Sequence, residues 1–98
     1  MKGYWIILGS AVTDTDAQQE YARLWAPIAE RYGAKLKALD PAALLESHNS
    51  KRVLAVEFPS YALAKACYED PAYAEAKAFA LRAARRELMV IEGDFLEG

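Results

Sequence analysis

The segment 52–58 is apolar on both sides of a predicted strand, and this pattern limits the folds that are open to the chain. Side chains alternate across a strand, so Val53 and Ala55 point to one side. Leu54 and Val56 point to the other. A chain of 98 residues has helices for only one face of such a sheet, so the other face requires a partner. We expect a second copy of the chain there, and we expect glutamates at Leu54 and Val56 to disrupt the pairing.

The composition is that of one globular domain spanning residues 1–98, a length near the commonest domain size. A net charge of −2, with acids and bases interspersed, offers no basic stripe for nucleic acid. No apolar run approaches the roughly 18 residues of a membrane span, and no signal-peptide pattern is present. Cys67 is the only cysteine, which excludes an internal disulfide and suits a reducing compartment. We therefore expect a cytoplasmic protein with neither nucleic acid nor membrane as a partner.

Four strands are predicted from short apolar runs, over residues 4–12, 34–39, 52–58 and 88–92. Lys35 and Lys37 interrupt the second run, which is typical of an edge strand. Between the second and third strands, residues 42–46 fit either a helical turn or the start of another strand.

Two helical regions separate the strands. The first has its N-cap at Asp16 and ends at Gly33, and Pro27 should kink or break its last turns. The second consists of residues 61–69 and 72–86, interrupted at Asp70-Pro71.

The order of these elements predicts an α+β fold, the ferredoxin-like β-α-β-β-α-β arrangement with an antiparallel sheet. Both helical regions must then cover the same face of the sheet. Two such sheets packed face to face form a dimeric α+β barrel. A monomer would leave an apolar face larger than soluble proteins usually expose.

Several short motifs follow one another along the chain: Lys2-Gly3-Tyr4-Trp5-Ile6, Tyr32-Gly33-Ala34, Val56-Glu57-Phe58-Pro59-Ser60, Tyr68-Glu69-Asp70-Pro71-Ala72-Tyr73, Leu81-Arg82 and Ile91-Glu92-Gly93. In order and spacing the chain resembles the small DUF1330 proteins nearly from end to end. The resemblance implies membership of the dimeric α+β barrel superfamily. That superfamily includes cofactor-free monooxygenases, haem-degrading enzymes, muconolactone isomerase and ligand-sensing modules, whereas DUF1330 itself carries no settled function. The resemblance therefore implies a scaffold and a pocket without naming a reaction.

Arg82 and Glu57 are charged residues that the predicted elements place among apolar ones. Arg82 falls in the apolar stripe of the last helix, where it would either clamp a carboxylate or enolate or form a structural ion pair. Glu57 interrupts an apolar strand and is the natural partner of Arg82, with a role as general base as the alternative. The structural role is the commoner one for such groups, and both are kept as candidate ligand-binding residues.

Aromatic side chains form a second candidate set. Tyr21 and Trp25 lie along the first helix, and Tyr68 and Tyr73 flank the Asp70-Pro71 break. Such residues could line a pocket for a flat aromatic ligand, with hydroxyl groups that orient it. The alternative for each is a half-buried core residue.

Other reactive residues give weaker signals. His48, the only histidine, lies in a polar loop and is not expected to be a haem ligand or a base. Cys67 lacks an activating neighbour on its helix and is expected to pack in the core. No second histidine, cysteine pair or carboxylate cluster offers a metal site, so we expect neither a metal nor a cofactor.

The favoured function is a homodimer that binds a small aromatic or carboxylate-bearing molecule between sheet and helices. One alternative is a cofactor-free monooxygenase or isomerase acting on an aromatic or keto-acid compound, so whether the protein is an enzyme stays open. The other is a structural dimer without a ligand, and a solidly packed interior would favour it.

Overall fold

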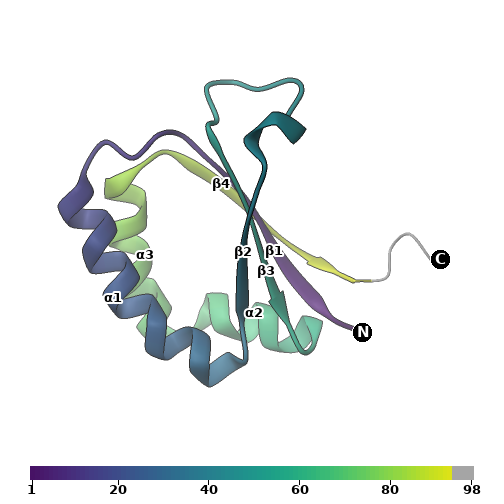
Figure 1. Ribbon diagram of the computed structural model, residues 1–98. Helices are drawn as coiled ribbons and strands as arrows, with labels where there is room; N and C mark the ends of the chain where they lie inside the picture. The colour runs from purple at the N-terminus through teal and green to yellow at the C-terminus, as the bar shows by residue number, and fades with distance from the viewer. Residues whose placement is uncertain (94–98) are drawn as a thin grey trace.

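The computed structural model describes residues 1–93 of the chain (Figure 1). Its elements in order are β1 (Gly3–Gly9), α1 (Thr15–Tyr32), β2 (Lys35–Leu39), the 3₁₀ helix η1 (Pro41–Ala43), β3 (Arg52–Phe58), α2 (Tyr61–Glu69), α3 (Pro71–Ala83) and β4 (Arg86–Glu92). Of the two alternatives for the chain after β2, the helical turn is therefore the one present. No helix within residues 1–93 combines the length and the apolar character that crossing a membrane demands.

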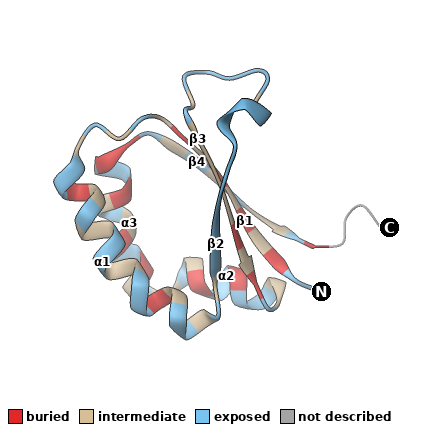
Figure 2. Cartoon of the chain, in the orientation of Figure 1, coloured by how far each residue is buried: buried red, intermediate tan, exposed pale blue. Residues whose placement is uncertain are grey.

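The strands form one antiparallel sheet in the order β2-β3-β1-β4. Figure 1 shows α1, α2 and α3 on the same side of this sheet. The order β-α-β-β-α-α-β, with the second helical region divided in two, confirms the predicted ferredoxin-like fold. Strand β2 is an edge and is exposed along its whole length, as its lysines predict (Figure 2).

The face of the sheet toward the helices carries the core. Trp5 and Val56 lie opposite each other in the β1–β3 register, and both are buried. Leu54 shares this parity. The expectation that Leu54 and Val56 face a partner was therefore wrong, because they point toward the helices. Val53 and Ala55 point away from them.

An apolar surface covers the opposite side, which we call the outer sheet face. Its members are neighbours in the strand registers: Tyr4, Ile6, Leu8, Leu39, Val53, Ala55, Met89 and Ile91. The helices lie on the other side of the sheet, so Met89 is 55% exposed and Leu39 is 38% exposed. This is the apolar face that the sequence pattern anticipated.

Helix α1 begins earlier than predicted and is not broken. Asp14, rather than Asp16, is the N-cap, and its side chain accepts a hydrogen bond from the Ala17 N–H at 3.0 Å. Gly33 ends the helix in the left-handed conformation, with φ of 65°. Pro27 lies on the exposed side of the helix, where the carbonyl that loses its N–H donor remains open to solvent.

Strand β1 and helix α3 are both shorter than predicted, because they end at Gly9 and Ala83 rather than at residues 12 and 86. Ala84 is extended (φ −164°, ψ 155°), so the chain leaves the helix and enters β4 at Arg86. The Thr13 N–H donates to the Ala83 carbonyl at 2.8 Å and joins the two connections. This earlier start of β4 places Arg86 opposite Gly9 in the sheet.

Asp70 lies between α2 and α3 and contacts the last turn of α1, so it fastens the three helices together. As predicted, the helical region is interrupted there. The carboxylate of Asp70 accepts hydrogen bonds from the Tyr32 hydroxyl at 2.5 Å and from the Ala72 N–H at 2.8 Å, and Arg31 lies 3.2 Å away. These contacts, the hydrogen bond from Tyr32 foremost, lower the pKa of Asp70 below its ordinary value.

Helix α2 packs closely on β1 at Gly3. A Cβ atom added to Gly3 would lie 2.5 Å from the Cα of Tyr61. The indole N–H of Trp5 donates to the carbonyl of Ala64 at 2.9 Å. At Gly9, by contrast, an added Cβ would meet its nearest neighbour at 3.5 Å. The two ends of β1 therefore differ in how closely other elements approach them.

We predict that Gly3→Ala lowers the free energy of unfolding by about 1–3 kcal/mol, because the clash with α2 forces a backbone shift. This outweighs the roughly 0.4–1 kcal/mol that an alanine gains through the unfolded state. The matched control Gly9→Ala should be neutral or slightly stabilising. Urea unfolding followed by tryptophan fluorescence measures both, and equal midpoints for the two variants would contradict the close packing of α2.

Candidate functional site

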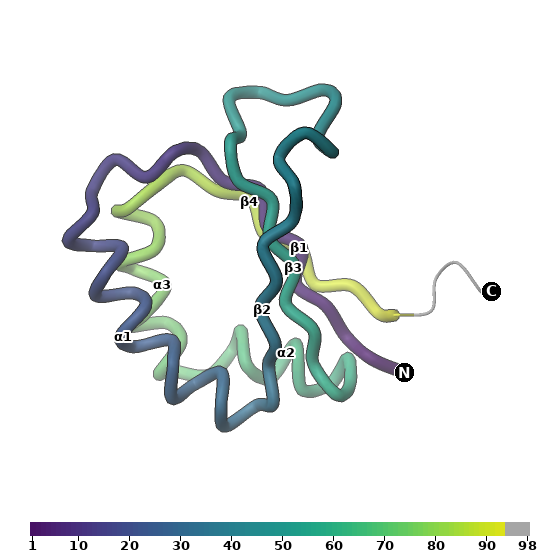
Figure 3. Tube along the Cα trace, in the orientation of Figure 1, coloured from purple at the N-terminus to yellow at the C-terminus, as the bar shows by residue number. Residues whose placement is uncertain are grey.

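A cavity of about 140 Å³ lies between the sheet and helices α1 and α3. Figures 1 and 3 show these helices diverging from the sheet toward the end where β1 finishes and α1 begins. The apolar lining comes from Trp5, Ile7, Trp25, Leu36, Leu54, Val56, Ala80 and Ala84. The polar lining comes from Gln18, Tyr21, Arg52 and Arg86, with Gly9 between strands. Leu36 is 55% exposed, so the cavity opens to solvent beside β2.

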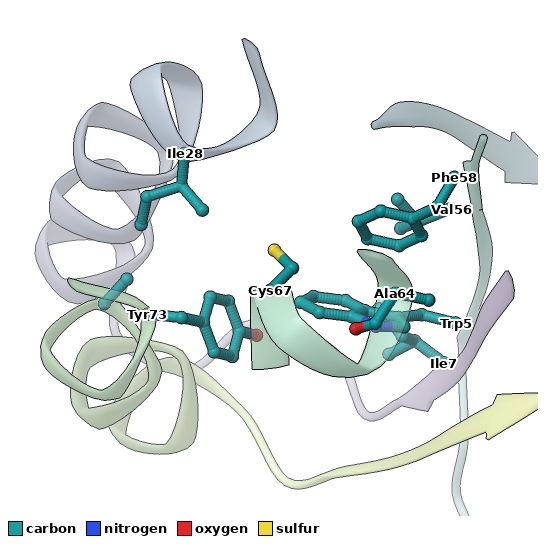
Figure 4. Packing of buried hydrophobic residues seen from close by; sticks show 9 residues of the cluster. Trp5, Ile7, Ile28, Val56, Phe58, Ala64, Cys67 and Tyr73 are labelled. Atoms are coloured by element: carbon teal, nitrogen blue, oxygen red, sulfur yellow. The ribbon is translucent and has the colours of Figure 1, made fainter. Parts of the chain in front are cut away.

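Trp5 forms the aromatic floor of the cavity. It projects from β1 among the core residues, and Tyr73 points toward it from α3 (Figure 4). The ring of Trp5 lies 4.9 Å from that of Tyr73 and 5.4 Å from that of Trp25. These separations are typical of favourable aromatic pairs. The floor is therefore held from the strand and from two helices.

Two arginines flank Gly9 at the polar end of the cavity. Gly9 is opposite Arg52 in the β1–β3 register and opposite Arg86 in the β1–β4 register. Neighbouring strands are about 4.8 Å apart, and because Gly9 has no side chain the Arg52 guanidinium lies over it: a Cβ added to Gly9 would meet Arg52 Nη1 at 3.5 Å. Within residues 1–93, neither arginine forms an ion pair with a carboxylate. We call this arrangement the arginine row.

A hydrogen-bond chain leads from the arginine row to α1. Arg86 Nη2 donates to the hydroxyl oxygen of Tyr73 at 2.6 Å, and that oxygen lies 3.0 Å from the hydroxyl oxygen of Tyr21. Burial, and next the neighbouring Tyr21, raise the pKa of Tyr73, so its hydroxyl keeps its proton at neutral pH. Burial alone would lower the pKa of Arg86, but Tyr73 and Tyr21 outweigh it and the net shift is upward. Arg86 is therefore a cation partly shielded from water.

The structure brings three of the predicted aromatic residues to this site. Tyr21 and Trp25 line the cavity, and Tyr73 joins it through its hydroxyl group. Tyr68 does not line the cavity. Its ring packs edge-on against the ring of Trp5, with 5.8 Å between the two ring centroids. Whether any of these residues binds a ligand remains a proposal.

Arg82 and Glu57 lie away from the cavity and from each other. Arg82 is exposed on α3, above the ring of Phe79 at 5.1 Å. Glu57 has the parity of the outer sheet face, where it accepts hydrogen bonds from Lys2 at 3.2 Å and Tyr4 at 3.3 Å. The predicted partnership between Arg82 and Glu57 was therefore wrong, because the sheet separates the outer face from the helices.

Arg52 and Arg86 are the functional candidates that sequence reasoning missed. Arg52 is the first residue of its strand, where a charged side chain is usually solvated, and Arg86 was predicted to be the last residue of the helix rather than the first residue of β4. The signal that could have found them is parity: Arg52 has the parity of Leu54 and Val56, and Arg86 that of Val90. Both strands present these positions to the helices.

Cys67 and His48 lie outside the site. Cys67 is buried in the core, as predicted, and burial raises the pKa of its thiol to about 12. His48 is exposed in the loop before β3, and its carbonyl accepts a hydrogen bond from Arg85 at 2.8 Å. In the described part of the chain, no three or more His, Cys, Asp or Glu residues come together in a way that could hold a metal ion.

Comparison with known families gives one match over most of the chain. The profile described as "Domain of unknown function (DUF1330)" matches residues 2–94. A search of curated proteins gave no match.

Solved structures with the same fold include proteins of quite different sequence. A protein of unknown function from Rhodopseudomonas palustris is 22% identical, with a TM-score of 0.66 and coverage of 93% of this chain and 81% of that one. A dimeric ferredoxin-like protein of unknown function from Jannaschia sp. CCS1 is 13% identical, with a TM-score of 0.71 and coverage of 94% and 99%. A variant of SnoaB, a cofactor-independent oxygenase from Streptomyces nogalater, is 9% identical, with a TM-score of 0.69 and coverage of 95% and 93%. At these identities the likeness extends to the fold alone.

We predict that the Cys67 thiol of the folded protein reacts very slowly with Ellman's reagent at neutral pH. A pKa of about 12 leaves on the order of 10³ times less thiolate than an unperturbed cysteine has. A control with Cys67→Ala and Ala66→Cys, which moves the thiol to the exposed neighbouring position, should react rapidly. Equal rates for both folded proteins would contradict the burial of Cys67.

Proposed function

We propose that this protein, which belongs to the DUF1330 family, binds a small aromatic anion in the cavity between its sheet and helices. The anion has one ring and a carboxylate or phenolate oxygen. The observation that carries the proposal is the arginine row, Arg52–Gly9–Arg86, at the end of an otherwise largely apolar cavity.

The volume of the cavity supports a ligand with one ring. At about 140 Å³ it is close to the ~150 Å³ of an engineered apolar cavity that holds benzene. Its opening beside Leu36 leaves room for a substituent to extend toward solvent. A fused polycyclic compound would require α1 to move.

The charge distribution supports an anion. Arg52 and Arg86 both line the cavity, and within residues 1–93 no Asp or Glu side chain lines it. A guanidinium group binds carboxylate oxygens through two parallel hydrogen bonds, and such charge-assisted bonds are stronger than neutral ones. Gly9 has no side chain that would come between these oxygens and the two arginines.

A catalytic function is the weaker candidate. SnoaB, which has this fold, is a cofactor-independent oxygenase, so a cofactor-free monooxygenase or isomerase remains the alternative for this chain. Among the residues that the structure describes, the cavity lining holds no carboxylate, histidine, lysine or cysteine side chain that would accept a proton at neutral pH. Binding of a ligand without catalysis therefore explains the residues that line the cavity with fewer assumptions. A structural dimer without a ligand would leave unexplained why two arginines without a carboxylate partner within residues 1–93 line this cavity.

We also propose that the protein forms a homodimer through the outer sheet face. The ferredoxin-like protein from Jannaschia sp. CCS1 is described as dimeric. Charges on this face favour a second copy as the occupant, since Lys35 and Lys37 lie on edge strand β2 and Glu87 lies on edge strand β4. A twofold axis parallel to the strands would place β2 of one protomer over β4 of its partner, so two edges of opposite charge would face each other.

We predict that benzoate and 4-hydroxybenzoate quench the tryptophan fluorescence saturably, because both of the chain's tryptophans line the cavity. Arg52→Gln should weaken binding about tenfold, the effect of losing one charge-assisted contact. Arg82→Gln removes the same charge outside the cavity and is the matched control. Gly9→Leu should abolish binding by filling the space between the arginines. If no single-ring acid binds, or if both arginine variants bind equally, the proposal is refuted.

We predict that Val53→Glu combined with Ala55→Glu converts a dimer into a monomer, because it buries like charges on the outer sheet face. Ala62→Glu with Ala66→Glu adds the same charge on the exposed side of α2 and should leave the dimer intact. Light scattering at micromolar concentration measures the mass. A monomeric wild-type protein, or a dimer that survives the strand substitutions, would contradict this interface.

A further inference from the structure

We infer that the cavity selects the ionised form of a phenolic ligand, because Arg86 and Tyr73 fix the Tyr21 hydroxyl as a hydrogen-bond donor toward it. The inference rests on the proposed function and adds the protonation state of the ligand. Tyr73 is, in this account, a positioning residue that acts through Tyr21.

The direction of the hydrogen bonds follows from the hydroxyl of Tyr73. Tyr73 is fully buried, and Arg86 and Tyr21 are the only side chains in the described part of the chain that hydrogen-bond to this hydroxyl. A guanidinium group only donates, so the oxygen of Tyr73 accepts from Arg86. The proton of Tyr73 must then go to the oxygen of Tyr21, since a buried donor without an acceptor is costly.

By the same argument, the hydroxyl proton of Tyr21 can be donated to a group in the cavity. Its oxygen already accepts from Tyr73, and no other acceptor for it is found within residues 1–93. Tyr21 is half-buried and belongs to the cavity lining. A ligand oxygen that displaces solvent there meets a donor and must accept.

Charge makes this donor favour an anion over a neutral hydroxyl. Arg86 carries its positive charge without a carboxylate partner among residues 1–93, and aligned hydroxyl dipoles of Tyr73 and Tyr21 extend its influence. A protonated phenol would also need an acceptor for its own proton. Among the lining side chains within residues 1–93, Gln18 offers one amide oxygen as an acceptor, whereas Arg52, Arg86 and Tyr21 all offer donors. The phenolate therefore binds better than the phenol.

The test uses 4-nitrophenol, a one-ring phenol whose ionised form is yellow and reports its own protonation by absorbance. With the full-length protein in excess, a pH titration gives the pKa of the bound probe. We expect it to lie about one unit below that of the free probe, which corresponds to about tenfold tighter binding of the phenolate. An unchanged or raised pKa of the bound probe would overturn the inference.

Tyr73→Phe supplies the matched comparison. Tyr73 is not part of the cavity lining, so this variant should still bind 4-nitrophenol, but the downward shift of the probe's pKa should shrink to less than half. Tyr68→Phe removes a hydroxyl that lies outside the chain of hydrogen bonds and should keep the full shift. A full shift in Tyr73→Phe would overturn the role given to that residue.

Failure of the inference is distinguishable from failure of the proposed function. If neither benzoate nor 4-nitrophenol binds, the proposed function fails. If both bind but the bound probe keeps its free pKa, only the inference fails. Should Tyr73→Phe not fold, the wild-type affinity for 4-nitrophenol is compared with that for its methyl ether, 4-nitroanisole, at a pH where the free phenol is ionised. About tenfold weaker binding of the ether supports the inference, and equal affinity overturns it.

Discussion

The burial of Trp5 at the centre of the sheet is the constraint on which the rest of the structure depends. Its ring contacts side chains from α1, α2, α3 and β3, and its N–H is satisfied only because the carbonyl of Ala64 comes within 2.9 Å. A buried indole needs such a partner. Helix α2 can approach this closely because Gly3 has no side chain. One aromatic residue and one glycine therefore set the position of α2 on the sheet.

The close packing of α2 at Gly3 affects the opposite end of β1, near Gly9. Asp70 holds the end of α1 to the junction of α2 and α3, so all three helices are anchored near α2. Toward Gly9, α1 and α3 diverge from the sheet, and the small residues Ala80 of α3 and Ala84, just after this helix, line the cavity there. The cavity thus results from an uneven packing of the helix layer, with Trp5 and Trp25 at its base.

Local patterns in the sequence were sufficient to predict the fold. The spacing of apolar residues, the helix caps and the turn residues each determine a helix, a strand or a turn from a few neighbouring positions. The site depended on a non-local fact: which face of the sheet the helices cover. Without it, Leu54 was assigned to the wrong face, and Arg52, which has the same parity, was overlooked. The predicted position of Arg82, within the apolar stripe of its helix, was wrong for a different reason. It directly precedes the buried Ala83, and a rotation of 100° per residue is enough to turn it into solvent.

The polar groups at the cavity are difficult to explain as structural devices. Replacing buried ionic groups by apolar ones of similar volume is often neutral or stabilising by about 1–4 kcal/mol. That is a substantial part of the roughly 5–15 kcal/mol by which small domains are stable. Here Tyr73 is buried and Arg86 is half-buried, and Arg86 has no carboxylate partner among residues 1–93. An aliphatic residue at position 86 would extend the apolar lining of the cavity. An anion bound between Arg52 and Arg86 offsets the desolvation of both, which is why a ligand accounts for this arrangement better than packing alone.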